Sequence, residues 1–377
     1  MSLLDTLFPD TLRVPAECEI RVDGLNIGKI GLNPLLREVS VDVARTEAAT
    51  ATLTFDTRRN EQGLWDVQDK NLIVPWAKVE IDAVFGSEKQ PVFHGYVRET
   101  RGEYPAERGS ATFTVTCQDV SMMLDREQRR KQHAREDKPT SDQQILAEIL
   151  KRSGLCACDD NDPGMSGITQ LNQDDTDIRL LRKRAEANGY ELIFYPREEG
   201  RDFVYFGRMR LSATPQPTIM VHAGPASHAA RVSVREDAMQ PDRIVVQFAD
   251  RENDRAITEE PRPETEVLGR ERLTSENRGL PSFERRLSGE AGDDQTVLGT
   301  RARAQSAEAD LRRVVAEGEL DGSTYGHVLQ VGLPVGLDGV GDRHSGIYYV
   351  DRVTHVFDAG GYRQQFTLLR NAVGDNL

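Results

Sequence analysis

The sequence lacks the features that mark membrane and secreted proteins. No run approaches the roughly 18 uninterrupted apolar residues of a membrane-spanning helix. The first residues, MSLLDTLFPDTLRVP, have neither the basic start nor the apolar stretch of a signal peptide. Four cysteines in 377 residues are too few and too scattered for a disulfide framework. We therefore expect a soluble protein that folds in a cytoplasm.

Motifs that carry catalytic chemistry are also scarce. The glycine-rich stretch Gly336 to Gly341 lacks the strand-then-helix context and the Lys-Ser/Thr pair of a phosphate loop. The seven histidines are dispersed, without an H-E-x-x-H motif, and no serine lies in a nucleophile elbow. Acidic residues are so numerous that some pair always looks placed for acid–base catalysis. The sequence predicts no catalytic residues and no cofactor.

One short cysteine motif raises the question of a metal site. Cys156 and Cys158 form a C-x-C pair beside Asp159, Asp160 and Asp162. No second Cys or His pair lies nearby to complete a tetrahedral site. Ordinary thiols are the favoured interpretation, and we expect no bound metal.

The charge balance is strongly acidic. There are 62 acidic and 48 basic residues, for a net charge of -14. Stable nucleic-acid binding needs clustered Lys and Arg, so we expect none. The one basic cluster, Arg126 to Arg135, is interpreted as a solvated helix or linker.

Length and composition indicate more than one packed unit. A chain of 377 residues exceeds what one hydrophobic core usually serves. Hydrophobic residues make up 38% and charged residues 29%, enough for real cores under a charged surface.

The first 120 residues have the pattern of β structure. Strands at Cys18 to Val22 and Leu25 to Ile30 flank Asp23-Gly24, a tight-turn pair. Short alternating runs follow, for instance Val39, Val41 and Val43. Such a series is typical of a barrel or sandwich.

Helical periodicity appears further along. Ser141 can cap a helix that Gly154 stops, and a second helix near Thr176 to Asn188 ends at Gly189. After strands at 190–195 and 203–206, residues 250–294 are crowded with charge and have little apolar periodicity. A long helix is predicted from Thr296 to about Glu317, before strands resume at Val328.

Two hairpin-like segments echo each other 253 positions apart. Tyr96-Val97 and Phe113 recur as Tyr349-Val350 and Phe366. The interpretation is one β-hairpin design used twice, with chance similarity between two hairpins as the alternative. The structural positions assigned to the two hairpins are Gly95, Tyr96, Val97, Phe113, Val115, Gly346, Tyr349, Val350, Gly361, Phe366 and Leu368.

The end of the chain resembles the late-control-D family of phage tail proteins, the hub proteins of contractile tail baseplates. The motifs that carry this resemblance are Leu329 to Gly339, Ser345 to His355, the turn Gly360-Gly361-Tyr362 and the closing Arg370-Asn371-Ala372. Earlier segments are also similar to that family, including Asp177 to Tyr190, Phe206-Gly207, Phe93 to Val97 and Cys117 to Asp119. Residues 250–295 match nothing in it.

The resemblance implies a mainly β fold with α+β insertions. It implies two tandem β-barrels of tail-tube type in one chain, which form a pseudo-sixfold ring as a homotrimer. The expected domains are a first barrel over 1–124, a mixed α/β module over 125–205, and a second, split barrel over 206–250 and 322–377. Residues 251–321 are expected to be a charged excursion plus the long helix.

The function implied by the resemblance is structural. The trimer would be a symmetry adaptor that joins a hexameric tail tube to a trimeric central spike and forms part of the central channel. Expected partners are the tube protein, baseplate wedge proteins and a separately encoded spike, because the similar region ends with the second barrel. DNA or other cargo would pass through the lumen without stable binding. The expected location is a virion tail baseplate or injection particle, assembled in the host cytoplasm.

Two other functions stay open at this point. A tail-associated cell-wall hydrolase or carbohydrate-binding module would need a placed acid pair or an aromatic platform, and only Trp65 and Trp76 are available as tryptophans. A β-rich adhesin or fibre subunit would be expected to show fibre-type repeats, which are absent from the sequence.

Overall fold

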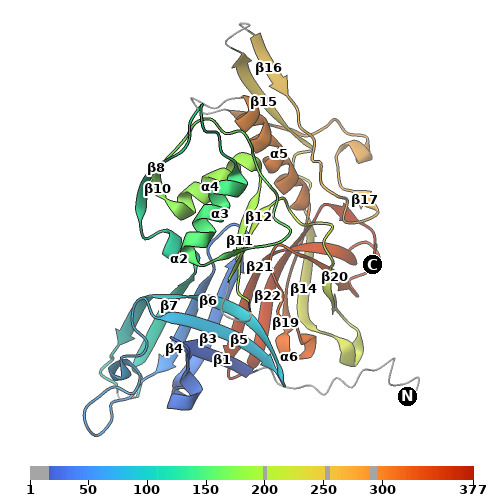
Figure 1. The fold of residues 1–377 in the computed structure, drawn as a ribbon. Helices are drawn as coiled ribbons and strands as arrows, with labels where there is room; N and C mark the ends of the chain where they lie inside the picture. The colour runs from blue at the N-terminus through green and yellow to red at the C-terminus, as the bar shows by residue number, and fades with distance from the viewer. Residues whose placement is uncertain (1–16, 108, 198–201, 251–254, 289–294) are drawn as a thin grey trace, which may run out of the picture.

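A 13-stranded sheet dominates the computed structural model, which describes residues 17–107, 109–197, 202–250, 255–288 and 295–377. The sheet fills the lower part of Figure 1, and most of the helices lie above it. The predicted mainly β fold with α and β insertions is confirmed.

Six strands build the first half of this sheet. In chain order they are β1 (Glu17–Val22), β3 (Leu36–Ala44), β4 (Thr50–Asp56), β5 (Lys78–Phe85), β6 (Glu88–Glu103) and β7 (Thr112–Asp119). They pair in the order β3-β4-β7-β6-β5-β1, and every pairing is antiparallel.

The turn predicted at Asp23-Gly24 is present, and both residues have positive φ. The strand after it, β2 (Leu25–Asn26), is shorter than predicted, because residues Ile27–Ile30 form a 3-10 helix. The Asn26 side chain accepts a hydrogen bond from the Gly28 amide at 2.8 Å and so starts that helix.

Six further strands build the second half. They are β13 (Gln216–Met220), β14 (Ala229–Glu236), β19 (Val314–Asp321), β20 (Pro334–Asp338), β21 (Gly346–Asp358) and β22 (Gly361–Arg370). Their order in space is β14-β19-β22-β21-β20-β13, which is the order of the first half strand for strand. One pairing differs, since β13 runs parallel to β20 whereas β1 runs antiparallel to β5.

Irregularities in the ladders also repeat. The register of β6 shifts at Arg98, and that of β21 shifts at Asp351, which lies 253 positions later. The register of β3 shifts at Arg37, and that of its counterpart β14 shifts at Ala230. Because bulges are specific local features, their recurrence makes β6 equivalent to β21 and β3 equivalent to β14.

The strand pairing corrects one detail of the hairpin pattern that recurs 253 positions later in the sequence. Thr100 pairs with Val115, and its equivalent Val353 pairs with Phe366. Val115 rather than Phe113 is therefore the counterpart of Phe366. The reason is the turn, because β6 and β7 have a longer connection than β21 and β22.

The two halves are joined through one long strand. The first part of β21 pairs with β20, while Arg352–Asp358 pair on the same side with Glu38–Ala44 of β3. The halves are therefore two half-barrels of one continuous sheet. Each encloses its own hydrophobic core, and Val43 of β3 borders both cores.

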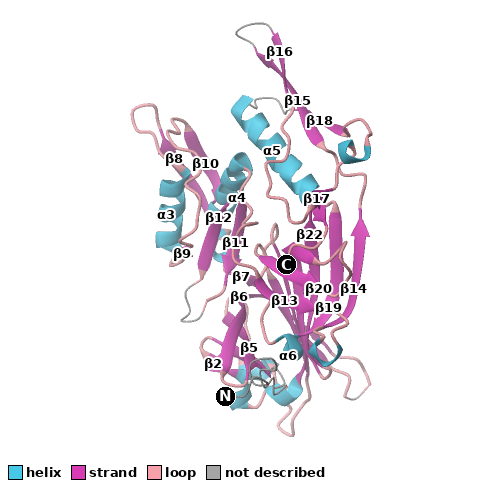
Figure 2. Cartoon of the chain, turned by 90° about the vertical axis from the view of Figure 1, so that its right-hand side faces the viewer, coloured by secondary structure: helices cyan, strands magenta, loops and turns pink. Residues whose placement is uncertain are grey.

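A mixed α/β module follows the first half and is seen at the left of Figure 2. It contains α2 (Ser121–Leu124), β8 (Gln128–Ala134), α3 (Asp142–Ser153), β9 (Cys156–Ala157), β10 (Leu171–Thr176), α4 (Asp177–Asn188), β11 (Glu191–Tyr195) and β12 (Phe203–Gly207). The predicted capping box at Ser141 and the left-handed glycines that end α3 and α4 are present. The basic cluster is not a helix or linker, because β8 pairs with the acidic strand β10.

The charged excursion carries more structure than the sequence suggested. Strands β15 (Arg243–Asp250), β16 (Arg255–Glu259) and β18 (Glu284–Ser288) form a separate sheet that projects at the top of Figure 2. The assignment of β15 to the second barrel is therefore wrong. Short elements also lie later in the chain, namely β17 (Glu271–Arg272), α6 (Gly322–Tyr325) and β23 (Ala372–Val373).

The long helix α5 (Gln295–Leu311) ends earlier than predicted. Residues 314–321 form β19 in the main sheet, so their assignment to the excursion is wrong as well. The apolar run Val314-Val315-Ala316 fits both a helix and a buried strand, and tertiary pairing decides for the strand. Within the described residues, no helix combines the length and the apolar character needed to cross a membrane.

Candidate functional site

One face of the main sheet is polar across both halves. Along β4 and β7, buried apolar residues alternate with half-buried or exposed threonines. The pairing register carries this alternation across the joint between the halves. The face is made by Glu317 and Glu319 of β19, Gln365 and Thr367 of β22, Arg352, Thr354, Val356 and Asp358 of β21, Glu38, Ser40 and Asp42 of β3, Thr50, Thr52 and Thr54 of β4, Thr112, Thr114 and Thr116 of β7, and Glu99, Arg101 and Glu103 of β6.

Charge is distributed unevenly over this polar face. The threonines of β4 and β7 make a neutral centre in the first half. The equivalent strands of the second half carry Glu317 and Glu319 in place of Thr52 and Thr54. The face therefore follows the same strand order in both halves and differs in charge.

Six of the eleven predicted hairpin residues lie in two separate cores. Val97, Phe113 and Val115 are buried in the first core, and Val350, Phe366 and Leu368 are buried in the second. Tyr349 packs in a third cluster beside α5. Gly95 and Gly346 are buried, Tyr96 is half-buried and Gly361 is exposed. Their role in ring formation stays a prediction.

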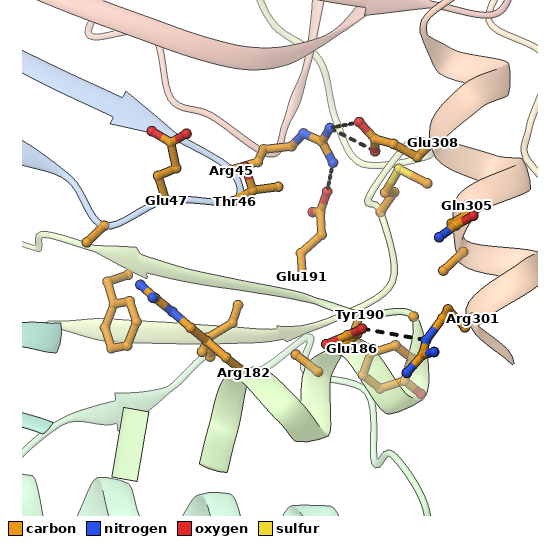
Figure 3. A pocket seen from close by; sticks show the side chains of 17 residues that line it. Arg45, Thr46, Glu47, Arg182, Glu186, Tyr190, Glu191, Arg301, Gln305 and Glu308 are labelled. Atoms are coloured by element: carbon orange, nitrogen blue, oxygen red, sulfur yellow. Dashed lines mark hydrogen bonds and ion pairs between the residues drawn. The ribbon is translucent and has the colours of Figure 1, made fainter. Parts of the chain in front are cut away.

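A buried arginine lies where four parts of the chain meet. Arg45 follows β3 and is 3% exposed. Its guanidinium donates to Glu191 of β11 at 2.5 Å, to Glu308 of α5 at 2.9 Å and to Asp351 of β21 at 3.0 Å. Figure 3 shows the Glu191 and Glu308 carboxylates converging on this group.

The partners of Arg45 are themselves held in place. The Tyr349 hydroxyl donates to Glu191 at 2.7 Å, and the Arg45 guanidinium lies 5.5 Å from the centre of the Tyr349 ring. Asp351 is the bulge residue of β21, so the bulge presents a carboxylate to the joint. Arg45 therefore ties both half-barrels, the α/β module and the long helix together.

Electrostatics favour the charged state of this group. Burial alone would lower the pKa of the Arg45 guanidinium, but the surrounding carboxylates raise it well above its ordinary value. Burial alone would raise the pKa of Glu308, but Arg45 and Arg312 hold it below its ordinary value. Breaking a buried pair by removing one partner is costly, so the geometry suits a fixed structural joint.

A cavity of about 520 Å³ opens beside Arg45. It lies between the β3–β4 turn, α4, β11 and α5, as Figure 3 shows. Arg301 and Glu186 face each other at its rim, 3.6 Å apart. Its apolar lining includes Ala48, Ala185, Leu192, Phe194, Met209 and Ala304.

The other chemical candidates are not brought together. Cys156 and Cys158 lie on or next to β9, and burial raises the pKa of the Cys158 thiol to about 11. Across the described part of the chain, no three His, Cys, Asp or Glu side chains form a group that could hold a metal ion.

Sequence reasoning missed the residues that hold this architecture together. Arg45 stands in an unremarkable turn, and its three carboxylate partners come from strands and a helix far apart in the sequence. Arg370 and Asn371, noted as a family motif, are fully buried. Asn371 donates to Asp310 of α5 at 2.9 Å, and this contact gives the motif a structural reason.

Comparison with known proteins identifies relatives of this fold. The family model described as the Alg8 N-terminal domain matches residues 16–358. The 43 kDa tail protein of prophage MuSo2 from Shewanella oneidensis is 14% identical, with a TM-score of 0.67, over 95% of this chain and 99% of that protein. A tail protein from Neisseria meningitidis is 13% identical, with a TM-score of 0.64, over 95% and 97%.

A further similar structure comes from a secretion system. It is an Escherichia coli component of the type VI secretion system, described as structurally similar to tail proteins of bacteriophage T4. It is 10% identical, with a TM-score of 0.55, over 94% of this chain and 76% of that one. No curated protein matches the sequence. The predicted resemblance to phage tail proteins is confirmed for the fold.

Proposed function

The chain belongs to the family described as the Alg8 N-terminal domain, and we propose that it is a structural hub of a contractile phage tail or a related injection particle. The observation that carries the proposal is the largely polar face that continues across two equivalent half-barrels. A sheet with its cores on one side and polar side chains on the other suits the wall of a water-filled channel. The fold shared with phage tail proteins supports the same assignment.

The proposed hub is a ring of three copies. Each copy contributes two half-barrels of equal strand order, so three copies present six similar units around one axis. The six similar half-barrels would fit the sixfold symmetry of a hexameric tail tube. Because the two half-barrels of each copy differ in charge, the ring would have threefold symmetry in charge, which fits a trimeric spike.

The proposed role is mechanical rather than chemical. The ion pairs of Arg45 with Glu191, Glu308 and Asp351 would hold the two half-barrels of a copy in a fixed arrangement when the tube and the spike exert force on the ring. A wall of threonines and acids would bind polyanionic or acidic cargo weakly, so that it passes through. The proposed partners are a tube protein, a central spike protein and baseplate wedge proteins, in an assembly that forms in the host cytoplasm.

The test is the absolute mass of the purified chain by light scattering over a range of concentrations. We expect three times the 42.2 kDa of one chain. Averaged electron micrographs of that species should show a ring with a central opening. A mass that stays at one chain at every concentration would contradict the ring, and release of fragments from purified cell walls would favour the hydrolase instead.

A further inference from the structure

The cavity of about 520 Å³ beside Arg45 is not used by the proposed hub. Protein interiors are close-packed and hold few voids larger than a water molecule. A cavity of this size lies in the range that takes small organic ligands. It is bounded by the β3–β4 turn, α4, β11 and α5, so a ligand in it would contact four parts of the chain. The side chains of its lining indicate which class of ligand fits.

The space is left open by small side chains. Ala48 of the β3–β4 turn, Ala185 of α4 and Ala304 of α5 each bring only a methyl group to the lining. Leu192 and Phe194 of β11 add larger apolar surface, half-buried at the border of the core of the α/β module. Covering such surface removes it from water, which favours a ligand with an apolar body.

The carboxylates of the lining are already paired. Four of them line the cavity, and two of these accept hydrogen bonds from Arg45. Glu186 lies 3.6 Å from the guanidinium of Arg301. Glu47 accepts a hydrogen bond from Arg352 at 2.8 Å. A cationic ligand would therefore find no unpaired carboxylate among the described residues that line the cavity.

The guanidinium of Arg182 on α4 is not paired in this way. No carboxylate in the described part of the chain lies within ion-pair distance of it, and the side chain is exposed. Its charge acts on the buried Asp119 only from a distance, and Asp119 already accepts a hydrogen bond from the Ala49 amide at 2.7 Å. In Figure 3, Arg182 lies on the side of the cavity opposite Arg301. An anionic group at Arg182 would therefore give this cation its partner.

We propose that the cavity binds a small amphipathic anion of the alkyl carboxylate class. Its apolar body would lie against the alanines, Leu192 and Phe194, and its carboxylate would pair with Arg182. Because Arg182 is exposed, the carboxylate would keep part of its hydration, so the cost of burying a charge is avoided. This inference concerns a single chain and goes beyond the proposed hub function.

Calorimetric titration of the full chain with decanoate, kept below its micelle concentration, tests the site. We expect saturable binding of about one decanoate per chain, and a thermal unfolding temperature that rises with decanoate concentration. Hexanoate should bind more weakly, by up to about fourfold for each methylene removed from apolar contact. Absence of saturable decanoate binding would overturn the proposal.

Removal of the cation tests the place of the carboxylate. Arg182→Gln should weaken decanoate binding by about two- to fivefold, the range of an exposed ion pair, and leave binding of uncharged decanol unchanged. The matched control is Arg179→Gln, the same change one turn earlier on α4 at a residue outside the lining. It should keep the wild-type affinity. Unchanged decanoate affinity in Arg182→Gln, or equal weakening in both variants, would overturn the assignment of the anion to Arg182.

Filling the cavity tests the place of the apolar body independently of charge. Ala304 is half-buried and faces the cavity, so the ring of Ala304→Phe has open space to enter. This variant should lose binding of both decanoate and decanol, while its thermal unfolding without ligand checks that the chain is folded. Wild-type binding by a folded Ala304→Phe chain would overturn the cavity as the site. If that variant does not fold, the comparison of Arg182→Gln with Arg179→Gln still decides.

Discussion

The two half-barrels share one strand order but fill their cores in opposite ways. In the first half, Leu53 of β4 lies opposite Val115 of β7. At the equivalent place in the second half, Gly318 of β19 lies opposite Phe366 of β22. A Cβ atom on Gly318 would lie 2.5 Å from the Phe366 ring. The larger side chain lies on β22 in the second half, whereas both strands contribute a branched side chain in the first half, so equivalent positions are filled by different residues.

The surroundings of the halves differ as well. The first core is closed mainly by its own loops, with Ile27, Leu32 and Val67 buried among the strands. The second core is closed by Tyr195 and Tyr205 of the α/β module. The two halves therefore share a topology but not the source of their packing, because the second core depends on the α/β module that lies between the two halves in the sequence.

The largest change in the free energy of unfolding is expected at Phe366, the large side chain of the Gly318–Phe366 pair in the second half. Phe366→Ala should lower the free energy of unfolding by about 3–5 kcal/mol, because the ring is 3% exposed and Gly318 beneath it cannot fill the space. Val115→Ala in the first half should cost less, since a smaller side chain is removed beside Leu53. Denaturant unfolding of both variants measures the difference. Equal losses would contradict the view that the halves distribute their bulk differently.

An effect of intermediate size is expected on the pH dependence of the free energy of unfolding, through His355 of the second half. His355 is 2% exposed and its ring contacts the Tyr362 hydroxyl at 2.8 Å, whereas the equivalent residue of the first half is Gly102. Burial lowers the pKa of His355 to about 3. Between that value and the ordinary pKa near 6.5, the unfolded chain binds the proton and the folded chain does not.

The contribution of the neutral His355 side chain to the free energy of unfolding is therefore fully present above pH 6.5 and is lost as the pH falls. The loss should be about 1.4 kcal/mol per pH unit, down toward pH 3. His355→Gln should remove that slope between pH 6.5 and 4.5, as measured by denaturant unfolding at several pH values. An unchanged slope would mean that other groups carry the acid sensitivity.

The smallest change in the free energy of unfolding is expected at the pairing of β21 with β3, which joins the two halves inside the chain. Asp42→Asn removes the carboxylate that pairs with Arg352, but both side chains are partly exposed. The free energy of unfolding should change by about 0–1 kcal/mol, the usual range for an exposed ion pair. The backbone ladder between β21 and β3 holds this joint within one chain. Thermal unfolding checks the prediction, and a loss far above this range would show that the charge pair itself holds the halves together.

Local sequence signals predicted the local structure well. The turn at Asp23-Gly24, the capping box at Ser141 and the C-terminal glycines of α3 and α4 depend on neighbouring residues, and all are present. The long helix was overextended into β19, because an apolar run is compatible with either element. The basic strand β8 was misread since its acidic partner lies over 40 residues away.

The sequence by itself determined the mainly β character, the repeated hairpin and the resemblance to phage tail proteins, because these rest on periodicity and on motifs of short range. Tertiary structure alone decided that the half-barrels share one sheet, that the polar face is continuous, and that Arg45 has three carboxylate partners. Each of these depends on contacts between residues far apart in the chain. Such contacts depend on which strand edges pair, and a single sequence carries no local signal for that choice.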